Sequence, residues 1–98
     1  MVLNTQAVHF TADQKLLDYI QQKLEKLNTY YDRIHEATVF LKMENSGQVK
    51  DKIVEVKLSL PGNTMVVAES NKSFEAAVDK AYATLKRQLV RWKERQRA

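Results

Sequence analysis

The sequence predicts an α+β domain with the element order β-α-β-β-β-α, in which a four-stranded, mostly antiparallel sheet carries two helices on one face. Three observations predict this fold. Two segments repeat apolar residues with the period of about 3.6 residues of an amphipathic helix. Two further segments alternate apolar and polar residues, as half-buried strands do, and Pro61-Gly62-Asn63 is a strong turn sequence between strands. Both helices must bury their apolar stripes, so we expect them to pack against one face of the sheet.

The length and composition fit one folded domain, which we expect to span residues 1–98. Apolar residues make up 44% of the chain and charged residues 29%. The longest apolar run has four residues, far fewer than a membrane span needs, and the first residues lack the features of a signal peptide. We therefore expect a cytoplasmic protein with no membrane partner. With no cysteine, the chain has no disulfide, thiolate nucleophile or cysteine-based zinc site.

The first strand is predicted over residues 2–8, and the first helix from a cap at residue 11 to about residue 28. Residues 2–8 contain no Gly or Pro and begin with two apolar residues, which allows a strand. The sequence Thr11-Ala12-Asp13-Gln14 fits a capping box that starts at Thr11. The apolar stripe of this helix consists of Leu16, Leu17, Ile20, Leu24 and Leu27.

Three strands follow. Residues 34–44 alternate, with Ala37, Val39, Leu41 and Met43 on the apolar face and Phe40 on the face that points outward. Asn45-Ser46-Gly47 is expected to turn the chain into a second alternating strand, which runs over residues 53–60. After the Pro-Gly-Asn turn, the β-branched run at residues 64–69 is expected to pair as a hairpin.

A long helix completes the fold. Ser73 is a suitable N-cap, and the apolar period continues to Trp92, so the helix is expected to run beyond that residue. The stripe consists of Phe74, Ala77, Val78, Ala81, Tyr82, Leu85, Leu89 and Trp92. Because the aromatic rings lie on this stripe, we expect them to pack in the core rather than to stack on bases. Tyr30 and Tyr31 are likewise expected to close the core after the first helix.

Positive charge is concentrated at the end of the chain. The net charge is +4, but residues 80–98 contain seven basic residues and one acid, a net +6 that leaves −2 for the rest. One flank of the last helix is free of acids and consists of Lys80, Thr84, Arg87, Arg91 and Arg95. Stacked like charges repel, so this row predicts a polyanionic partner. The other flank has both signs, as an ordinary solvated edge does; it consists of Glu75, Asp79, Lys86, Lys93 and Arg97.

The first helix has a similar basic ridge, which consists of Lys15, Tyr19, Lys23 and Lys26, with its acids on the opposite flank. If the helices lie side by side, this ridge and the acid-free row are expected to border a common groove that faces a phosphate backbone. The alternative is that the lysines are simply solvated and that the basic end of the last helix interacts favourably with the helix dipole.

The sequence lacks the patterns of an enzyme or a metal protein. His9 and His35 have no His, Asp or Glu at a helical ligand spacing, and two glycines cannot form a phosphate-binding loop. No nucleophile elbow or paired catalytic carboxylates occur. We therefore expect no catalysis, no cofactor, no metal and no small-molecule substrate.

Two segments resemble a known family. Residues 23–34 read KLEKLNTYYDRI and resemble the K-x-x-K-L-x-x-Y-[FY]-D-R-I stretch of the ribosome hibernation promoting factors, the ribosome-associated inhibitor A family. Residues 74–79 and 85–95 look like the family's A-[IV]-D and R-Q-L-x-[KR]-x-K-x-K patterns. With the predicted element order, the resemblance covers the whole chain. Because the chain ends at Ala98, it resembles the short form, for which ribosome pairing would need another hibernation factor or a separate mechanism.

The resemblance implies a double-stranded-RNA-binding-like fold. It also implies a stress-response protein that binds ribosomal RNA between the head and body of the small subunit, where messenger and transfer RNA would sit. Translation would be blocked and idle ribosomes preserved. Thr84 stands where the family often has a lysine, and we expect Lys80, one turn earlier, to compensate. The candidate RNA-binding residues are Lys23, Lys26, Arg33, Lys80, Lys86, Arg87, Arg91, Lys93 and Arg95.

Two alternatives stay open. A general double-stranded-RNA-binding module has the same layout, but it places lysines at the start of its last helix, where this chain has Glu75 and Asp79. A protein-binding or homodimeric module would use the outer face of the sheet, with Phe40 as an exposed contact. Salt dependence separates these alternatives, because only phosphate contacts make binding strongly sensitive to salt.

Overall fold

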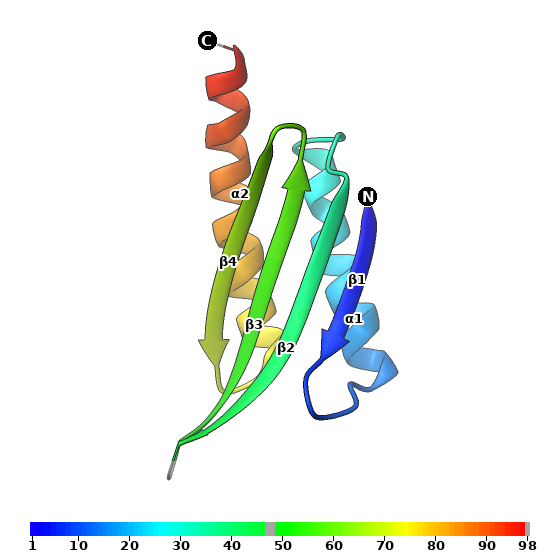
Figure 1. The fold of residues 1–98 in the computed structure, drawn as a ribbon, viewed down its shortest axis with the longest axis vertical. Coiled ribbons are helices and arrows are strands. Elements are labelled where there is room, and N and C mark those ends of the chain that lie inside the picture. The colour runs from blue at the N-terminus through cyan, green and yellow to red at the C-terminus, as the bar shows by residue number, and fades with distance from the viewer. Residues whose placement is uncertain (47–48, 98) are drawn as a thin grey trace.

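A computed structural model describes residues 1–46 and 49–97, and it confirms the predicted element order (Figure 1). The elements are β1 (Val2–Ala7), α1 (Gln14–Glu25), the short 3-10 helix η1 (Lys26–Thr29), β2 (Glu36–Ser46), β3 (Val49–Leu60), β4 (Asn63–Asn71) and α2 (Phe74–Arg97). Within these two ranges, no helix is long and apolar enough to cross a membrane.

The four strands form one sheet in chain order, β1-β2-β3-β4. The pairs β2–β3 and β3–β4 are antiparallel, whereas β1 is parallel to β2. The expected mostly antiparallel sheet is therefore confirmed. Parallel neighbours cannot be joined by a tight turn, and α1 with η1 provides the crossover from β1 to β2.

Both helices lie on one face of the sheet, and the core fills the space between them and the strands (Figure 1). The strand residues that enter this core are the alternate apolar residues that the sequence predicted. Val39 and Leu41 of β2 and Val54 and Val56 of β3 have no exposed surface. Met43 continues the same face but is 48% exposed, because the β2–β3 hairpin projects beyond the helices that cover the sheet (Figure 1). The prediction that Met43 is buried is wrong for this reason.

The N-cap of α1 is Asp13 rather than Thr11. The backbone N–H of Leu16 donates to Asp13 Oδ1 at 2.8 Å, which satisfies one of the free amides of the first turn. The capping-box prediction started two residues too early, because Thr11 and Asp13 are both cap-forming residues and only the position of the helix start distinguishes them. The helical segment then ends in η1, where Tyr30 N–H and Tyr31 N–H donate to the Leu27 carbonyl at 3.0 and 3.2 Å.

The two hairpins differ in how well the sequence predicted their turns. Leu60 pairs with Asn63, so Pro61 and Gly62 form the tight β3–β4 turn, and Gly62 has φ of +71°. A positive φ at the position after Pro favours glycine, and the turn that was predicted here is confirmed. The predicted first turn at residues 45–47 is displaced, because β2 runs through residue 46, which pairs with residue 49. Gly47 lies outside the described residues.

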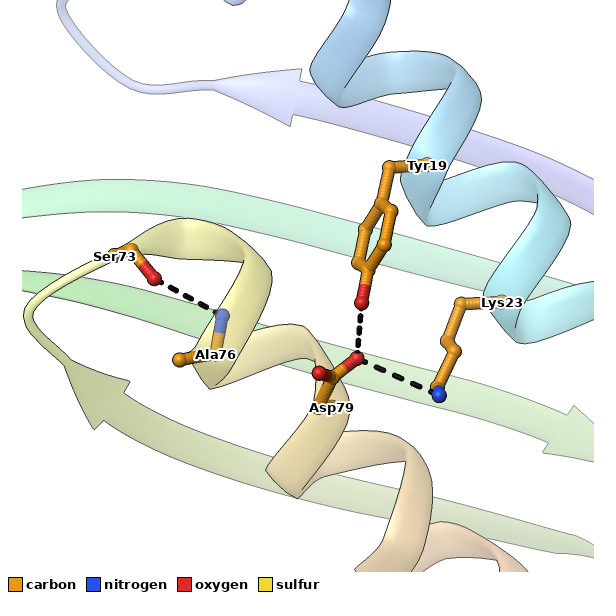
Figure 2. Close-up of polar contacts among 5 residues, drawn as sticks. All are labelled: Tyr19, Lys23, Ser73, Ala76 and Asp79. Carbon is orange, nitrogen blue, oxygen red and sulfur yellow. Dashed lines mark hydrogen bonds and ion pairs between the residues drawn. The ribbon is translucent and has the colours of Figure 1, made fainter.

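The start of α2 matches the prediction. Ser73 Oγ accepts a hydrogen bond from Ala76 N–H at 3.2 Å (Figure 2). The stripe is buried from Phe74 to Leu89, whereas Tyr82 and Trp92 are only half-buried. The C-terminal end of α2 projects past the β3–β4 turn (Figure 1). The last turns of α2 therefore extend beyond the edge of the sheet.

Candidate nucleic-acid interface

One flank of α2 contacts α1 through Asp79. The Asp79 carboxylate accepts a hydrogen bond from the Tyr19 hydroxyl and lies 3.5 Å from Lys23 Nζ (Figure 2). Lys23 Nζ also lies 5.1 Å from the centre of the Tyr82 ring. The hydrogen bond to Asp79 is the main reason that the pKa of Tyr19 is raised. The expectation of an ordinary solvated edge therefore fails at Asp79, which joins the two helices, whereas Glu75 and Lys86 of the same flank are exposed as expected.

The acid-free row of α2 lies on the side toward β4. Arg91 and Arg95 line a hollow together with Asn63 and Met65 of β4. Since the ridge of α1 faces the opposite flank of α2, the ridge and the row do not border a common groove, and that expectation is also wrong. The sequence gives the angle of a residue around its own helix, but the identity of the neighbouring element on each flank depends on the packing of the whole domain.

Three lysines of the candidate set gather around Tyr30. Lys86 Nζ lies 4.9 Å from the centre of the Tyr30 ring, and Lys93 Nζ donates to the Tyr30 carbonyl oxygen at 2.8 Å. The interaction with Lys86, followed by that with Tyr82, lowers the pKa of the Tyr30 phenol, and the charge of Lys26 acts in the same direction. The same contact raises the pKa of Lys86. Tyr30 therefore contacts Lys86 and Lys93 of α2 and lies within the electrostatic influence of Lys26.

These opposite shifts predict an order of tyrosine ionisation. Tyr30 is expected to ionise below its ordinary pKa of 10.0, and Tyr19 and Tyr82 above it, because Lys86 stabilises one phenolate while Asp79 and burial disfavour the others. Ultraviolet absorbance of tyrosinate during an alkaline titration measures this order. The stabilisation contributed by neutral Tyr19 is full below pH 10.0 and is lost as the pH rises through its higher folded pKa.

Two variants check the assignment. Tyr30→Phe is expected to remove the earliest absorbance step, and Lys86→Met is expected to move that step to higher pH. A first step that both variants leave unchanged would show that another tyrosine carries it.

The outer face of α2, which points away from the sheet, holds a second group of cations. Lys86, Arg87 and Arg91 are exposed and surround a shallow hollow of about 560 Å³ that also contacts Tyr82, Ala83, Val90 and Glu94. Lys80 is also exposed but lies seven residues before Arg87, about 10 Å along the helix axis. The helix thus presents an unusually basic outer surface over its second half.

The C-terminal end of α2 holds the remaining candidates on two sides of Trp92. On the side of the η1–β2 connection, Arg33 and Lys93 line a hollow of about 460 Å³. On the side of β4, Arg91 and Arg95 line one of about 240 Å³. Trp92 lines both hollows.

The structure therefore brings most of the predicted site residues together around the second half of α2. Six of these residues are exposed, namely Lys26, Arg33, Lys86, Arg87, Arg91 and Arg95. The seventh, Lys93, is half-buried. Lys80 lies apart, and Lys23 is paired with Asp79. Sequence reasoning did not predict that Tyr30 contacts Lys86 and Lys93. The one sequence feature that pointed to Tyr30 was its place in the segment at residues 23–34.

The open face of the sheet has a different character. Phe40 is half-buried on it, between Gln6 and Glu55 of the neighbouring strands, so the predicted outward direction is confirmed. Lys42 pairs with Glu55 at 3.5 Å, and Val66 is 56% exposed. Charge of both signs and scattered apolar residues suit no phosphate backbone, so the face that carries the helices is the better candidate interface.

Comparisons with known proteins agree with this picture. The profile of the family described as Sigma 54 modulation protein / S30EA ribosomal protein matches residues 3–97. The chain is 32% identical, over 98 residues, to a Pseudomonas putida protein named ribosome hibernation promoting factor; the match covers 100% of the chain and 92% of that protein. It is 34% identical over 83 residues to a ribosome hibernation promotion factor of Deinococcus radiodurans, which covers 84% of the chain and 44% of that protein.

Two solved structures have the same fold. The crystal structure of the Thermus thermophilus Protein Y N-terminal domain is 27% identical, has a TM-score of 0.80, and covers 94% of this chain and 99% of that one. A ribosomal subunit interface protein from Coxiella burnetii is 20% identical, has a TM-score of 0.86, and covers 96% and 99%.

Proposed function

Because the chain belongs to the Sigma 54 modulation protein / S30EA ribosomal protein family, we propose that it is a ribosome hibernation factor whose helical face binds small-subunit ribosomal RNA. Relatives named ribosome hibernation promoting factor support a ribosome-associated hibernation role. We place the contact near the messenger and transfer RNA sites, where bound protein inhibits translation by idle ribosomes. In this proposal residues 1–98 act as one ribosome-binding unit in the cytoplasm and need no cofactor.

The observation that carries this proposal is the exposed cluster of Lys86, Arg87 and Arg91 on the outer face of α2. Neighbouring cations on a helix repel one another unless an anion neutralises them. Phosphates are the anions that an RNA surface supplies at close spacing, and guanidinium groups can bind them through two parallel hydrogen bonds.

The position of the charge along α2 favours this proposal over a general double-stranded-RNA-binding module. Such a module would need cations at the N-terminal end of α2, where backbone amides and the helix dipole also attract phosphates. Here Glu75 and Asp79 occupy that end, and Asp79 binds Tyr19 and Lys23 of α1. The cations begin at Lys80 and are densest beyond Lys86.

Cosedimentation tests the proposal. Purified protein is mixed with isolated small subunits, large subunits or a generic RNA duplex over a range of salt concentrations. We expect binding to small subunits with little to the others, and an affinity that falls with salt with a log-log slope of about −3.5 to −4.5 if five phosphates are contacted. Transfer RNA is expected to compete for the same subunits.

The other outcomes discriminate between the alternatives. Equal binding to any duplex would favour the general RNA module. Absence of binding to all three would contradict the proposal and leave a protein partner on the open sheet face, for which salt dependence should be weak.

A further inference from the structure

A hollow at the end of α2 is built from three segments that are far apart in the chain. The η1–β2 connection contributes Tyr31, Asp32 and Arg33; the β3–β4 turn contributes Pro61; and α2 contributes residues 92, 93 and 96. Its volume of about 460 Å³ lies within the range of about 300–1,000 Å³ typical of small-molecule sites. The hollow of about 240 Å³ on the other side of Trp92 falls below that range.

Aromatic and apolar groups form one part of this hollow. The Trp92 and Tyr31 rings meet edge to face, with centres 5.0 Å apart and planes at 87°. Both rings pack against the core, yet both are only half-buried, so part of each ring is accessible. Pro61 adds an apolar surface. A partly exposed aromatic ring beside an apolar surface suits a flat heterocycle, because every nucleobase has a face that can stack.

Charged and polar groups form the other part. Arg33 is exposed, and among the described residues it makes no hydrogen bond or ion pair within the chain. Lys93 is fixed in position, because its Nζ donates to the Tyr30 carbonyl oxygen at 2.8 Å. The Gln96 amide and the Asp32 carboxylate can bond the donor and acceptor groups on the edge of a base.

We propose that this hollow binds one unpaired nucleotide of an RNA strand, with its base against Trp92 and its phosphate on Arg33. The inference rests on the proposed RNA-binding function and adds a defined subsite to it. A base inside a duplex has both faces covered and its edge paired, so only an unstacked nucleotide can present a face and an edge to the same pocket. The subsite thus selects single-stranded segments, in contrast to the phosphate contacts on the outer face of α2.

The experiment uses Trp92 as its own reporter, because it is the only tryptophan in the chain. Its fluorescence is followed while the protein is titrated with hexa-adenylate or, separately, with a short inorganic polyphosphate of similar charge. Hexa-adenylate is expected to quench Trp92 emission with saturation. Polyphosphate is expected to displace hexa-adenylate and to leave the emission of the free protein unchanged, since it has no base to stack.

Two variants locate the phosphate contact. Arg33→Gln removes the unpaired charge and is expected to raise the Kd for hexa-adenylate about tenfold, as the loss of one charged hydrogen bond predicts. Lys57→Gln removes an equal charge from an exposed position on the open sheet face and is expected to leave the Kd unchanged. Thermal unfolding confirms that both variants are folded.

The outcomes separate the subsite from the proposed function. If the wild-type protein cosediments with small subunits but saturating hexa-adenylate does not quench Trp92, or if Arg33→Gln binds hexa-adenylate as tightly as wild type, the subsite is overturned and the ribosome-binding proposal stands. If hexa-adenylate quenches and Arg33→Gln weakens binding, but no cosedimentation occurs, the subsite stands and the ribosome-binding proposal fails.

Discussion

Replacing Arg87 and Arg91 together by glutamate is expected to abolish cosedimentation with small ribosomal subunits, with a loss of affinity of at least about 100-fold. Both side chains are exposed on α2 and line the same hollow. Each charged hydrogen bond contributes about 1.5–3 kcal/mol, so losing two corresponds to at least about two orders of magnitude in Kd. The glutamates would also repel the phosphates that the arginines attract.

The matched control is Lys57→Glu with Lys72→Glu, which changes the net charge by the same amount at two exposed positions outside the candidate site. This control is expected to retain most of the binding. The unfolding midpoints of both double variants should stay near the wild-type value, since none of the four side chains belongs to the core. A folded Arg87→Glu/Arg91→Glu protein that binds like wild type would remove the outer face of α2 from the interface.

The second large effect is expected in the core, where Leu85→Ala should lower the free energy of unfolding by about 3–4 kcal/mol. Leu85 has no exposed surface and lies on the stripe of α2 that packs against the sheet. Truncating a buried leucine removes its transfer free energy and leaves a cavity, which together typically amount to about 2–5 kcal/mol. Denaturant-induced unfolding, followed by circular dichroism, measures the change.

Two neighbours on α2 calibrate this measurement. Trp92→Ala is expected to have a smaller effect, about 2 kcal/mol, because the indole is only half-buried against Tyr31. Gln88→Ala, at an exposed position, is expected to change stability by less than about 0.5 kcal/mol. Equal stabilities for Leu85→Ala and Gln88→Ala would contradict the assignment of this stripe to the core.

Much of the fold could be predicted because burial leaves a periodic trace in the sequence. The alternation in β2 and β3 and the stripe of α2 identified nearly all of the faces that enter the core. The two features that depend on one residue type in one local geometry, the Ser73 cap and the Pro61-Gly62 turn, were also predicted. Such features are local, so a short window of sequence contains what determines them.

The errors concern information that no short window contains. The direction of Asp79 toward Tyr19 and Lys23 depends on where α1 lies beside α2, and it adds a helix–helix contact to an edge that was predicted to be only solvated. Met43 is exposed because the β2–β3 hairpin extends beyond the two helices, and this depends on the lengths of the strands relative to the helices. The cap at Asp13 was not predicted for a different reason. Thr11 and Asp13 are both suitable N-cap residues, and the prediction chose Thr11, whereas the helix begins directly after Asp13.

Because α2 is the last element of the chain, one helix both completes the core and adds the basic surface. The sheet keeps an uncovered apolar face until α2 has been synthesised, since this helix supplies Leu85 and Leu89 to the core. The same helix carries most of the excess positive charge. A partly synthesised chain therefore has neither a closed core nor the basic surface of α2, so we expect it to gain stability and charge together when this helix is completed.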